Sequence, residues 1–440
     1  MGGPLKIAVF AYEFPALSET FVLNQITGLI DQGHDVMIFA ERPRGEPQVH
    51  VEVARYDLDQ RTRYLRMPKN LFLRVIAGAG LVLRLIWRCP CQVLRALNVW
   101  RHGRVASSLR LLFWVATVRD GGNVDIVHCH FGPMGLLAVH LREIGVLSGR
   151  LVTVFHGVDI SAQLVDQPDY YRRLFSTGDL FLPISRRWQD KLIELGTDPA
   201  RTHVHHMGTS LRGIRFRSRY CGPDQPLFVL TVGRLVEKKG IEYGIEAIAQ
   251  LARHGVDVRY TIIGDGPLQP RIENLIQSLG VEDRVRCLGW QDSRVVMAMM
   301  ETADILLAPS VTTADGDQEG IPVTLMEAMA TGMLVVASRH SGIPELVEHG
   351  VSGILVPERD ARGIAAAILN LVADAAHWSE MSRVARERIT EAFDIDCLNL
   401  ELVERFRDLI DDPVRHDASE NFDIGFKQDV RRYRRSAVLD

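Results

Sequence analysis

Two glutamates, Glu319 and Glu327, are separated by seven residues in the stretch EGIPVTLMEAMATG. Pro322 between them suits the first position of a helix, because its missing N–H would be unpaired there anyway. The free N–H groups and positive dipole end of such a helix favour an anion such as a diphosphate. Carboxylates accept hydrogen bonds from paired sugar hydroxyls. The spacing therefore fits a nucleotide sugar, with a sugar near each glutamate, but it also fits an ordinary helix with two solvated glutamates.

A D-x-D pair, Asp315 and Asp317, comes just before the first of these glutamates. Carboxylates at this spacing can bind a divalent metal ion. The pair follows the apolar run LLAPS and stands in a polar loop. We therefore expect a solvated loop that borders the ligand pocket, and we predict that the protein requires no metal ion.

Cations and histidines follow other apolar runs. Arg234 and Lys239 lie in GRLVEKKG, where Arg would offer a phosphate two hydrogen bonds and Lys a point charge. The lysine just before Lys239 is the weaker candidate. His156 ends the run LVTVFH, while His128 and His130 alternate around a cysteine in DIVHCH. The sequence places no third metal ligand there, so packing or contact with an acceptor is the favoured interpretation of that pair.

The elements that must position these residues are strands that alternate with amphipathic helices. KIAVFAY, DVMIFA, DIVHCHF and LVTVFHG form one series, with a helix predicted at 18–32, and LFVLTVGRL, YTIIGDG, DILLAPS and MLVVAS form another. This alternation predicts parallel sheets with crossover helices. A chain of 440 residues is too long for one ordinary core, and a proline-marked linker lies near 222–225. The predicted class is α/β, with two doubly wound, Rossmann-like domains that face each other across a cleft.

The predicted divisions of the chain follow from these two series. They are an N-terminal domain at 1–222, a C-terminal domain at 223–393, a helix at 394–412 that crosses back to the N-terminal domain, and a polar tail at 413–440.

Composition narrows the class of protein. Hydrophobic residues make up 47% of the chain and charged residues 24%, with a net charge of −4, as in a soluble globular protein. Six scattered cysteines give no disulfide framework. The N-terminus reads as a strand rather than a signal peptide, and no uncharged apolar run is long enough to span a bilayer. We expect a cytoplasmic protein.

The segment at 61–119 contains twelve Arg or Lys residues and no Asp or Glu, interspersed with Leu, Val, Trp and Phe. Basic amphipathic helices of this composition lie on anionic membrane surfaces. The alternative is a set of packed helices whose arginines extend to solvent. RNA binding is less favoured, because the arginines are spread among core-type residues, and we predict no nucleic-acid partner.

The stretch EGIPVTLMEAMATGMLVVAS, with SGIPELVEHGVSGILV after it, resembles the signature of retaining glycosyltransferases with the GT-B fold. The resemblance extends upstream through VGRLVEKKGIEYGIEAI and covers most of 227–357. The N-terminal motifs FPALSETFVLNQITGLIDQGHDV, HCHFGPMG and FHGVDIS are similar to bacterial capsule and exopolysaccharide transferases of the colanic-acid type. The chain is thereby identified, from its motifs, as a candidate member of that family.

The resemblance implies a role for each candidate residue. Glu319 would bind the donor sugar, Glu327 the ribose, and His156 the donor hexose, while Arg234 and Lys239 would neutralise the diphosphate. The predicted catalytic residues are His156, Arg234, Lys239 and Glu319. The predicted donor-binding residues are Glu327, Gly320, Ile321, Pro322, Val323, Thr324, Leu325, Gly233, Asp265, Gly289 and Trp290.

Asp265 and the residues around Ser18 also have structural interpretations. Asp265 suits a structural role in a tight turn as well as a ligand contact. Ser18 is a fair helix cap with Glu19 in the first turn. Alternatively Ser18, Glu19 and Thr20, together with His130, contact the acceptor or the donor phosphate.

These features predict a transferase that moves a hexose, with retention of configuration, from a UDP- or GDP-sugar to a lipid-linked or oligosaccharide acceptor in polysaccharide biosynthesis. No cofactor is expected, and an anionic membrane surface at the inner face of the cell membrane is the expected partner of 61–119. The alternatives are a non-catalytic nucleotide-sugar or membrane-binding module on the same fold, and a phosphorylase that uses pyridoxal phosphate. The first is disfavoured because all five charged or histidine candidates occur together, and the second because no lysine is clearly placed for a Schiff base.

Overall fold

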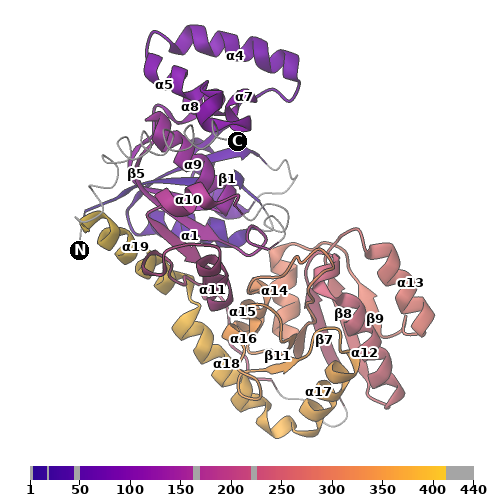
Figure 1. Cartoon of the computed structure of the whole chain (residues 1–440). Coiled ribbons are helices and arrows are strands. Elements are labelled where there is room, and N and C mark those ends of the chain that lie inside the picture. The colour runs from indigo at the N-terminus through magenta and orange to yellow at the C-terminus, as the bar shows by residue number, and fades with distance from the viewer. Residues whose placement is uncertain (1–2, 17–18, 44–49, 162–168, 220–224, 413–440) are drawn as a thin grey trace, which may run out of the picture.

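The computed structural model describes residues 3–16, 19–43, 50–161, 169–219 and 225–412, so Ser18 and the tail at 413–440 lie outside the described residues. The described chain forms two units, each built on a six-stranded parallel sheet with helices on its faces (Figure 1). The predicted α/β class with two doubly wound units is confirmed.

The N-terminal sheet has the strand order β3-β2-β1-β4-β5-β6. Its strands are β1 (Lys6–Glu13), β2 (Asp35–Arg42), β3 (Thr62–Tyr64), β4 (Asn123–His130), β5 (Ser148–Phe155) and β6 (Leu180–Pro183). Its covering helices include α1 (Thr20–Asp31), α2 (Val51–Arg55), α3 (Leu58–Arg61), α9 (Gly132–Ile144), α10 (Arg172–Thr177) and α11 (Arg186–Glu194). Because helices pack on both faces, β1 reads as a continuous apolar run and is fully buried from Ile7 to Ala11.

The C-terminal sheet repeats this topology, with the order β12-β11-β10-β7-β8-β9. Its strands are β7 (Leu227–Val232), β8 (Val258–Ile263), β9 (Val285–Cys287), β10 (Ile305–Ala308), β11 (Leu334–Ser338) and β12 (Ile354–Val356). Its helices include α12 (Ile241–Arg253), α13 (Gln269–Leu279), α14 (Ser293–Thr302), α15 (Val323–Thr331), α16 (Ile343–Leu346) and α17 (Ala361–Ala373). The strand order reverses between β7 and β10, and in open α/β sheets ligands bind outside the carboxyl ends of the strands at such a reversal.

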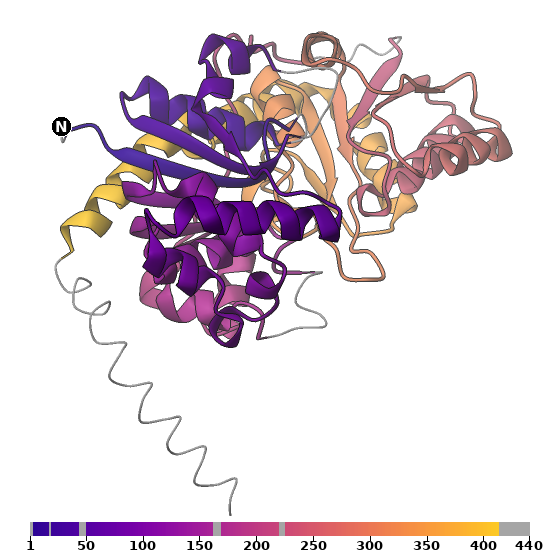
Figure 2. The ribbon, with the colours of Figure 1, turned by 90° about the horizontal axis from the view of Figure 1, so that it is seen from above.

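The basic segment is a group of helices inserted between β3 and β4. They are α4 (Leu71–Leu85), α5 (Pro90–Ala96), α6 (Val99–His102), α7 (Arg104–Ser107) and α8 (Arg110–Val118). Helix α8 enters the N-terminal core through Leu111 and Trp114, whereas α4 lies outermost, at the top of Figure 1 and nearest the viewer in Figure 2. No helix within the described residues is both long and apolar enough to cross a membrane.

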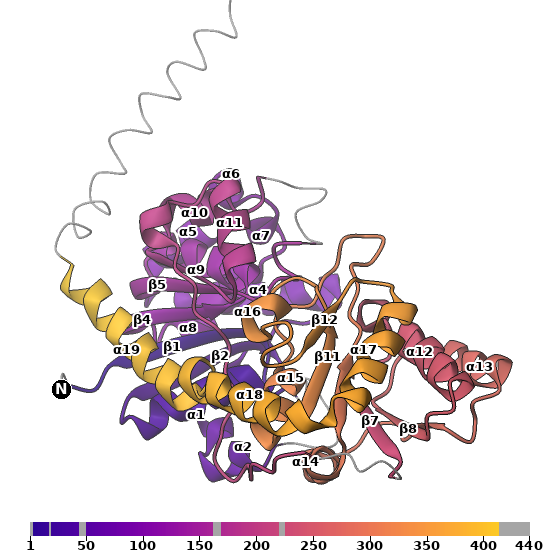
Figure 3. The same cartoon turned by 90° about the horizontal axis from the view of Figure 1, so that it is seen from below.

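Two long helices at the end of the described chain join the units. Helix α18 (Trp378–Ala392) packs on α15, and α19 (Ile395–Asp411) returns to pack on α1. Figure 3 shows both helices running along the underside of the molecule, from the C-terminal unit to the N-terminal unit. Leu402 and Phe406 of α19 are part of the N-terminal hydrophobic core.

Two predicted helix starts are displaced. The helix predicted at 18–32 spans Thr20–Asp31, with Glu19 at its N-cap. Pro322 was expected at the first helical position, but its ψ of 125° is extended and it is the N-cap of α15, which begins at Val323. A proline fits both places, because neither requires its missing N–H.

The contact of α1 with α19 gives a matched pair of glycine substitutions. A Cβ at Gly28 would lie 1.9 Å from Nδ2 of Asn399, whose side chain is buried, whereas a Cβ at the exposed Gly80 of α4 would meet nothing within 4 Å. We expect Gly28→Ala to lower the melting temperature by several degrees through overpacking. Gly80→Ala should leave it unchanged or raise it slightly, since Ala is the better helix former by about 1 kcal/mol. Thermal unfolding followed by circular dichroism measures both, and equal effects would contradict the role of this contact.

Candidate active site

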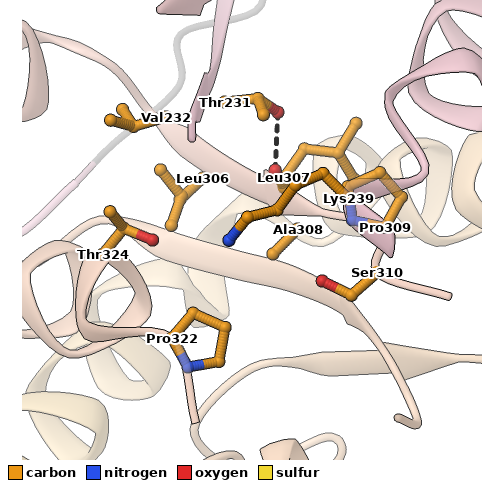
Figure 4. Close-up of a pocket in the computed structure, with 10 residues that line it drawn as sticks. All are labelled: Thr231, Val232, Lys239, Leu306, Leu307, Ala308, Pro309, Ser310, Pro322 and Thr324. Carbon is orange, nitrogen blue, oxygen red and sulfur yellow. Dashed lines mark hydrogen bonds between the residues drawn. The ribbon is translucent and has the colours of Figure 1, made fainter. Parts of the chain in front are cut away.

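A pocket lies at the carboxyl ends of β7 and β10, where the strand order of the C-terminal sheet reverses (Figure 4). Lys239 extends its amino group into this pocket from the turn after β7, and Thr324 faces it from the first turn of α15. The hydroxyl of Thr231 donates to the carbonyl of Leu307 over 2.6 Å and joins the two strands beneath it. The full lining is Thr231, Val232, Lys239, Leu306, Leu307, Ala308, Pro309, Ser310, Pro322 and Thr324.

An ion pair between Lys239 and Glu319 borders this pocket. Nζ of Lys239 lies 3.0 Å from Oε2 of Glu319, and the side chains are only 19% and 11% exposed. Burial alone would raise the pKa of the Glu319 carboxyl, but the charges of Lys239 and Lys238 outweigh burial and lower it. Glu319 is therefore held as a carboxylate at neutral pH, next to a fixed cation.

The two aspartates of the D-x-D pair face different partners. Asp317 lies 3.0 Å from Nζ of Lys238, which is also 3.9 Å from Glu319. Asp315 accepts hydrogen bonds from the Thr313 hydroxyl and from the backbone N–H of Asp317. These bonds build the aspartates into the loop, and they make Lys238 part of the charged cluster, although Lys239 was the favoured candidate of the two lysines.

Glu327 lies in the second turn of α15, in a different environment from that of Glu319. Burial is the sole cause of a shift that raises its pKa to about 7. The two predicted glutamates thus have opposite electrostatic settings, one with a paired cation and one without an opposing charge.

The residues from Ile321 to Leu325 contribute in different ways. Pro322 and Thr324 line the pocket. The side chains of Ile321 and Leu325 are buried in the hydrophobic core of the C-terminal unit. Those two side chains serve packing, so only their backbone remains for a ligand at this helix entrance, which Val323 begins.

The loop at Gly320 meets the N-terminal unit. A Cβ at Gly320 would lie 2.6 Å from Cδ1 of Ile184 and 3.4 Å from the carbonyl oxygen of His156. A larger residue at this position would force the Ile184 side chain to shift. The structure thus brings the predicted His156 and the residue after Glu319 together across the junction of the two units.

His156 is part of a buried group of rings. Its Nε2 lies 3.2 Å from Nδ1 of His130, and the rings of Phe21 and Phe131 pack against it at centroid distances of 4.7 and 4.4 Å. Burial lowers the pKa of His156 to about 3, so its ring is neutral at pH 7. Phe21 brings the first turn of α1, which contains the predicted Thr20 and follows Glu19, to the same group of rings.

Asp159 fixes the backbone around His156. Its carboxylate accepts the N–H groups of His156 (2.9 Å), Gly157 (3.0 Å) and Gly132 (2.8 Å). Burial raises its pKa to about 6 despite these hydrogen bonds. Asp159 was not predicted from the sequence, although Asp side chains commonly bond nearby backbone groups and this one stands three residues after the candidate His156.

The remaining predicted donor-site residues lie in the loops that follow β7, β8 and β9. Oδ1 of Asp265 accepts the N–H of Trp290 over 2.9 Å, so Asp265 ties the loop after β8 to the loop after β9. Gly289 has a φ of 66° in the second of these loops. A Cβ at Gly233 would lie 3.1 Å from Cε of Lys239. Arg234 is exposed, beside this glycine.

Three residues that hold the site together were not predicted from the sequence. His340 accepts the N–H of Glu319 at Nε2, and Glu358 bonds the other ring nitrogen. Glu345 joins the two units by accepting the N–H of Arg186 over 2.8 Å. His340 and Glu358 each stand two residues after a strand of the predicted sheet, and that position was the available signal.

A separate group of possible metal ligands lies between α6 and α9. Ligand atoms of His102, His140 and Glu143 lie within 4.8 Å of one another. The two Nδ1 atoms of the histidines are already 2.9 Å apart, and Glu143 is paired with both Arg101 and Arg173. These arginines supply the charge that a cation would, so the arrangement fits a hydrogen-bonded histidine pair and an ion-pair network.

Comparisons with known proteins agree with this geometry. Residues 18–212 match the model of Glycosyltransferase Family 4, and residues 216–388 match that of Glycosyl transferases group 1. The putative colanic acid biosynthesis glycosyltransferase WcaL of Escherichia coli is 42% identical over 405 residues, which cover 90% of this chain and 98% of the relative. The amylovoran biosynthesis glycosyltransferase AmsK of Erwinia amylovora is 41% identical over 402 residues, with coverages of 91% and 98%. The solved structure of HepE of Anabaena, in complex with UDP and glucose, has a TM-score of 0.67 at 18% identity and covers 92% of this chain and 100% of that one.

Two doubly wound units with a TM-score of 0.67 to HepE have the GT-B fold, and the two family matches define the chain as a glycosyltransferase. The chain belongs to the group 1 glycosyltransferases whose N-terminal half is of the Family 4 type, the family that includes WcaL and AmsK. The predicted resemblance to GT-B glycosyltransferases of the colanic-acid type is confirmed.

The raised pKa of Glu327 predicts a pH-dependent gain in stability when this residue becomes Gln. Between the ordinary carboxyl pKa of 4.5 and about 7, the folded state retains a proton that the unfolded chain has released. Stability from this group is therefore present at low pH and is lost as the pH rises through 7. Glu327→Gln should melt several degrees above the wild type at pH 8, and the difference should shrink toward zero at pH 4.5. Thermal unfolding at both pH values is the measurement, and the exposed Glu391→Gln is the control. An equal shift at both pH values would contradict the assignment.

Proposed function

We propose that this glycosyltransferase moves a hexose from a UDP- or GDP-sugar to a lipid-linked or oligosaccharide acceptor, with retention of anomeric configuration, in capsule or exopolysaccharide biosynthesis. The observation that carries the proposal is the Lys239–Glu319 ion pair beside the start of α15. The likeness to the colanic acid and amylovoran biosynthesis glycosyltransferases WcaL and AmsK supports the polysaccharide pathway, and the UDP and glucose of the HepE complex support a nucleotide-sugar donor.

Each charged residue has a role in this proposal. The helix entrance at Pro322–Thr324 and the cations of Lys239 and Arg234 bind the diphosphate and stabilise the charge that develops on it as the sugar leaves. Glu319 accepts hydrogen bonds from hexose hydroxyls, and Glu327 accepts them from the ribose. The acceptor hydroxyl attacks from the face of the leaving diphosphate, and a diphosphate oxygen takes its proton.

The N-terminal unit supplies the acceptor side of the reaction in this proposal. The neutral ring of His156, held by Asp159 and packed on His130, is suited to contact the hexose as a hydrogen-bonding group without a charge. The first turn of α1, with Glu19 and Thr20, lies on the same side through Phe21. We propose no resident cofactor and no metal requirement, because Lys238 and Lys239 already provide cations at the loop that contains Asp317.

A panel of UDP- and GDP-sugars, assayed for binding and slow hydrolysis, tests the proposal. We expect one donor to be turned over by the wild type, and Glu319→Ala to lower turnover about 100-fold or more because it removes a contact to the reacting sugar. EDTA should have no effect. Glu391→Ala, at an exposed position of α18, is the matched control and should behave as the wild type. Normal turnover by Glu319→Ala would refute the site, and binding without turnover by the wild type would favour the non-catalytic module.

The membrane part of the proposal concerns the outer face of α4. Besides Leu71 and Leu73 in its first turn, its exposed large apolar residues recur at helical spacing and form one stripe that continues just past the helix: Phe72, Val75, Ile76, Leu83 and Trp87. The opposite face, with Gly78 and Leu85, is buried against the rest of the unit. Trp100, on α6, is fully exposed as well. A contiguous exposed apolar face of this kind marks an interaction site.

The charges around this stripe favour an anionic lipid surface as its partner. Arg84 and Arg88 are exposed beside it, and the whole segment from 61 to 119 lacks acidic residues. Arginines attract anionic headgroups while Trp and aliphatic side chains enter the boundary between headgroups and acyl chains. We therefore propose that the protein is peripheral at the inner face of the cell membrane, where a lipid-linked acceptor would be presented.

Flotation with vesicles separates this partner from the others. The wild type should float with vesicles of phosphatidylglycerol and phosphatidylcholine but not with phosphatidylcholine alone, and less so at high salt. Leu83→Ser should weaken flotation by up to about tenfold, because it removes one aliphatic side chain that would be buried in the membrane. The double variant Arg84→Glu, Arg88→Glu should abolish flotation. Leu400→Ser on α19 and Arg294→Glu on α14, which are exposed elsewhere, are the matched controls. Salt-insensitive or absent binding would refute the proposal, and a dimer in sedimentation that Leu83→Ser dissociates would assign the face to a second copy.

A further inference from the structure

The loop that contains Glu319 is attached to the C-terminal sheet at two points. It runs from the end of β10 at Ala308 to the start of α15 at Val323. Near its beginning, Thr312 donates its backbone N–H to Oε2 of Glu358 over 2.8 Å. Near its end, Glu319 donates its own N–H to Nε2 of His340 over 3.0 Å. One clamp on each side therefore restricts the backbone of this loop.

The two clamping side chains are bonded to each other. Nδ1 of His340 lies 2.6 Å from Oε1 of Glu358, and the side chain of His340 is fully buried. His340 stands two residues after β11, and Glu358 stands two residues after β12. Because neighbouring parallel strands end at the same edge of a sheet, these positions bring the pair together beneath the loop.

These contacts fix the tautomer of His340. A backbone N–H can only donate, so Nε2 must accept from Glu319 and carries no proton. The proton of the neutral ring is then on Nδ1, where it is donated to the Glu358 carboxylate. Burial alone would raise the pKa of Glu358, but the hydrogen bonds from Thr312 and His340 outweigh it and lower the pKa, which keeps the acceptor ionised.

We propose that His340 and Glu358 are positioning residues that set the backbone of Glu319, and through it the carboxylate that meets the donor hexose. The inference rests on the proposed function, because it assigns a role within that site. Neither residue is expected to contact the substrate. Their effect on turnover arises because displacement of a catalytic group by about 1 Å can cost up to about 100-fold in rate.

Glu358→Gln is the sharpest test, since it keeps the size of the side chain. An amide has one oxygen and one NH₂ group, so it cannot accept both from Thr312 N–H and from His340 Nδ1–H. If the NH₂ group faces His340, the ring must carry its proton on Nε2, opposite the N–H of Glu319, and that bond is lost. We expect turnover of the active nucleotide sugar to fall about 10- to 100-fold, while the Kd for UDP or GDP, which lack the hexose, changes less than threefold.

A double-mutant cycle with Glu319→Gln separates positioning from a general structural effect. If Glu358 acts through Glu319, then Glu358→Gln should cause little further loss of turnover once Glu319 is Gln. The effects of substitutions at two residues that act together are not additive. Glu391→Gln serves as the matched control. His340→Gln retains an acceptor near Nε2 and should keep more activity than His340→Ala, which supplies none.

The outcomes are distinct. No turnover of any nucleotide sugar by the wild type defeats the proposed function itself. A wild type that is active while Glu358→Gln remains within twofold of it overturns the positioning role, as does an undiminished loss in the Glu319→Gln background or an equal loss of nucleotide affinity. If circular dichroism shows that Glu358→Gln is unfolded, the same cycle is decided with His340→Gln.

Discussion

The ion pair of Lys239 and Glu319 is the interaction on which the rest of the site depends. A buried carboxylate remains ionised when nearby positive charges or hydrogen-bond donors offset the loss of water, and at Glu319 the charges of Lys239 and Lys238 do so. The two residues are 80 positions apart in the chain, and they meet because β7 and β10 are neighbours at the reversal of strand order. The glycines around them serve this approach: a Cβ at Gly264 would lie 1.9 Å from the carbonyl oxygen of Gly233, next to the Lys239 side chain. Sheet topology and tight loops thus place the charge before any ligand arrives.

The contrast between the two glutamates of the motif follows from this arrangement. Glu319 is stabilised as an anion by neighbouring lysines, whereas burial raises the pKa of Glu327 to about 7 and the stability of the fold pays for it at higher pH. An unpaired carboxyl in such a place is a cost to folding that a ligand's hydroxyl groups can offset. Their environments therefore suit the two roles proposed for them. Glu319 would be a fixed anion near the reacting hexose, and Glu327 would accept hydrogen bonds from the ribose of the donor.

The sequence predicted the strands and the two units, because both depend on local apolar runs. It named Lys239 and Glu319 as separate candidates and did not predict that they form an ion pair. It placed Pro322 one position too far into the helix, since a proline satisfies both the cap and the first turn. It missed His340 and Glu358 because their place two residues after a strand does not reveal their partners: Glu319 and Thr312 lie 21 and 46 residues away in the chain, and strand pairing brings them close. For α4 the sequence favoured a helix on a membrane surface and left packed helices as the alternative, since a helix that is apolar on both faces does not reveal which face its neighbours cover.

The site also depends on how the two units are held together. Glu345 of the C-terminal unit accepts the N–H groups of Arg186 and Arg187 at the start of α11, and Nε2 of His206 lies 3.2 Å from the same carboxylate. Burial would raise the pKa of Glu345, but these hydrogen bonds outweigh it and lower it, as expected for an anion at a helix N-terminus. Gly320 also stands at this junction of the two units, where a Cβ would lie 2.6 Å from Cδ1 of Ile184. A carboxylate at a helix start is directional, unlike an apolar patch, so it specifies the angle between the units as well as their association. A polar contact outside the pocket therefore acts together with α18, α19 and the approach of Gly320 to Ile184 in holding His156 near the Glu319 loop.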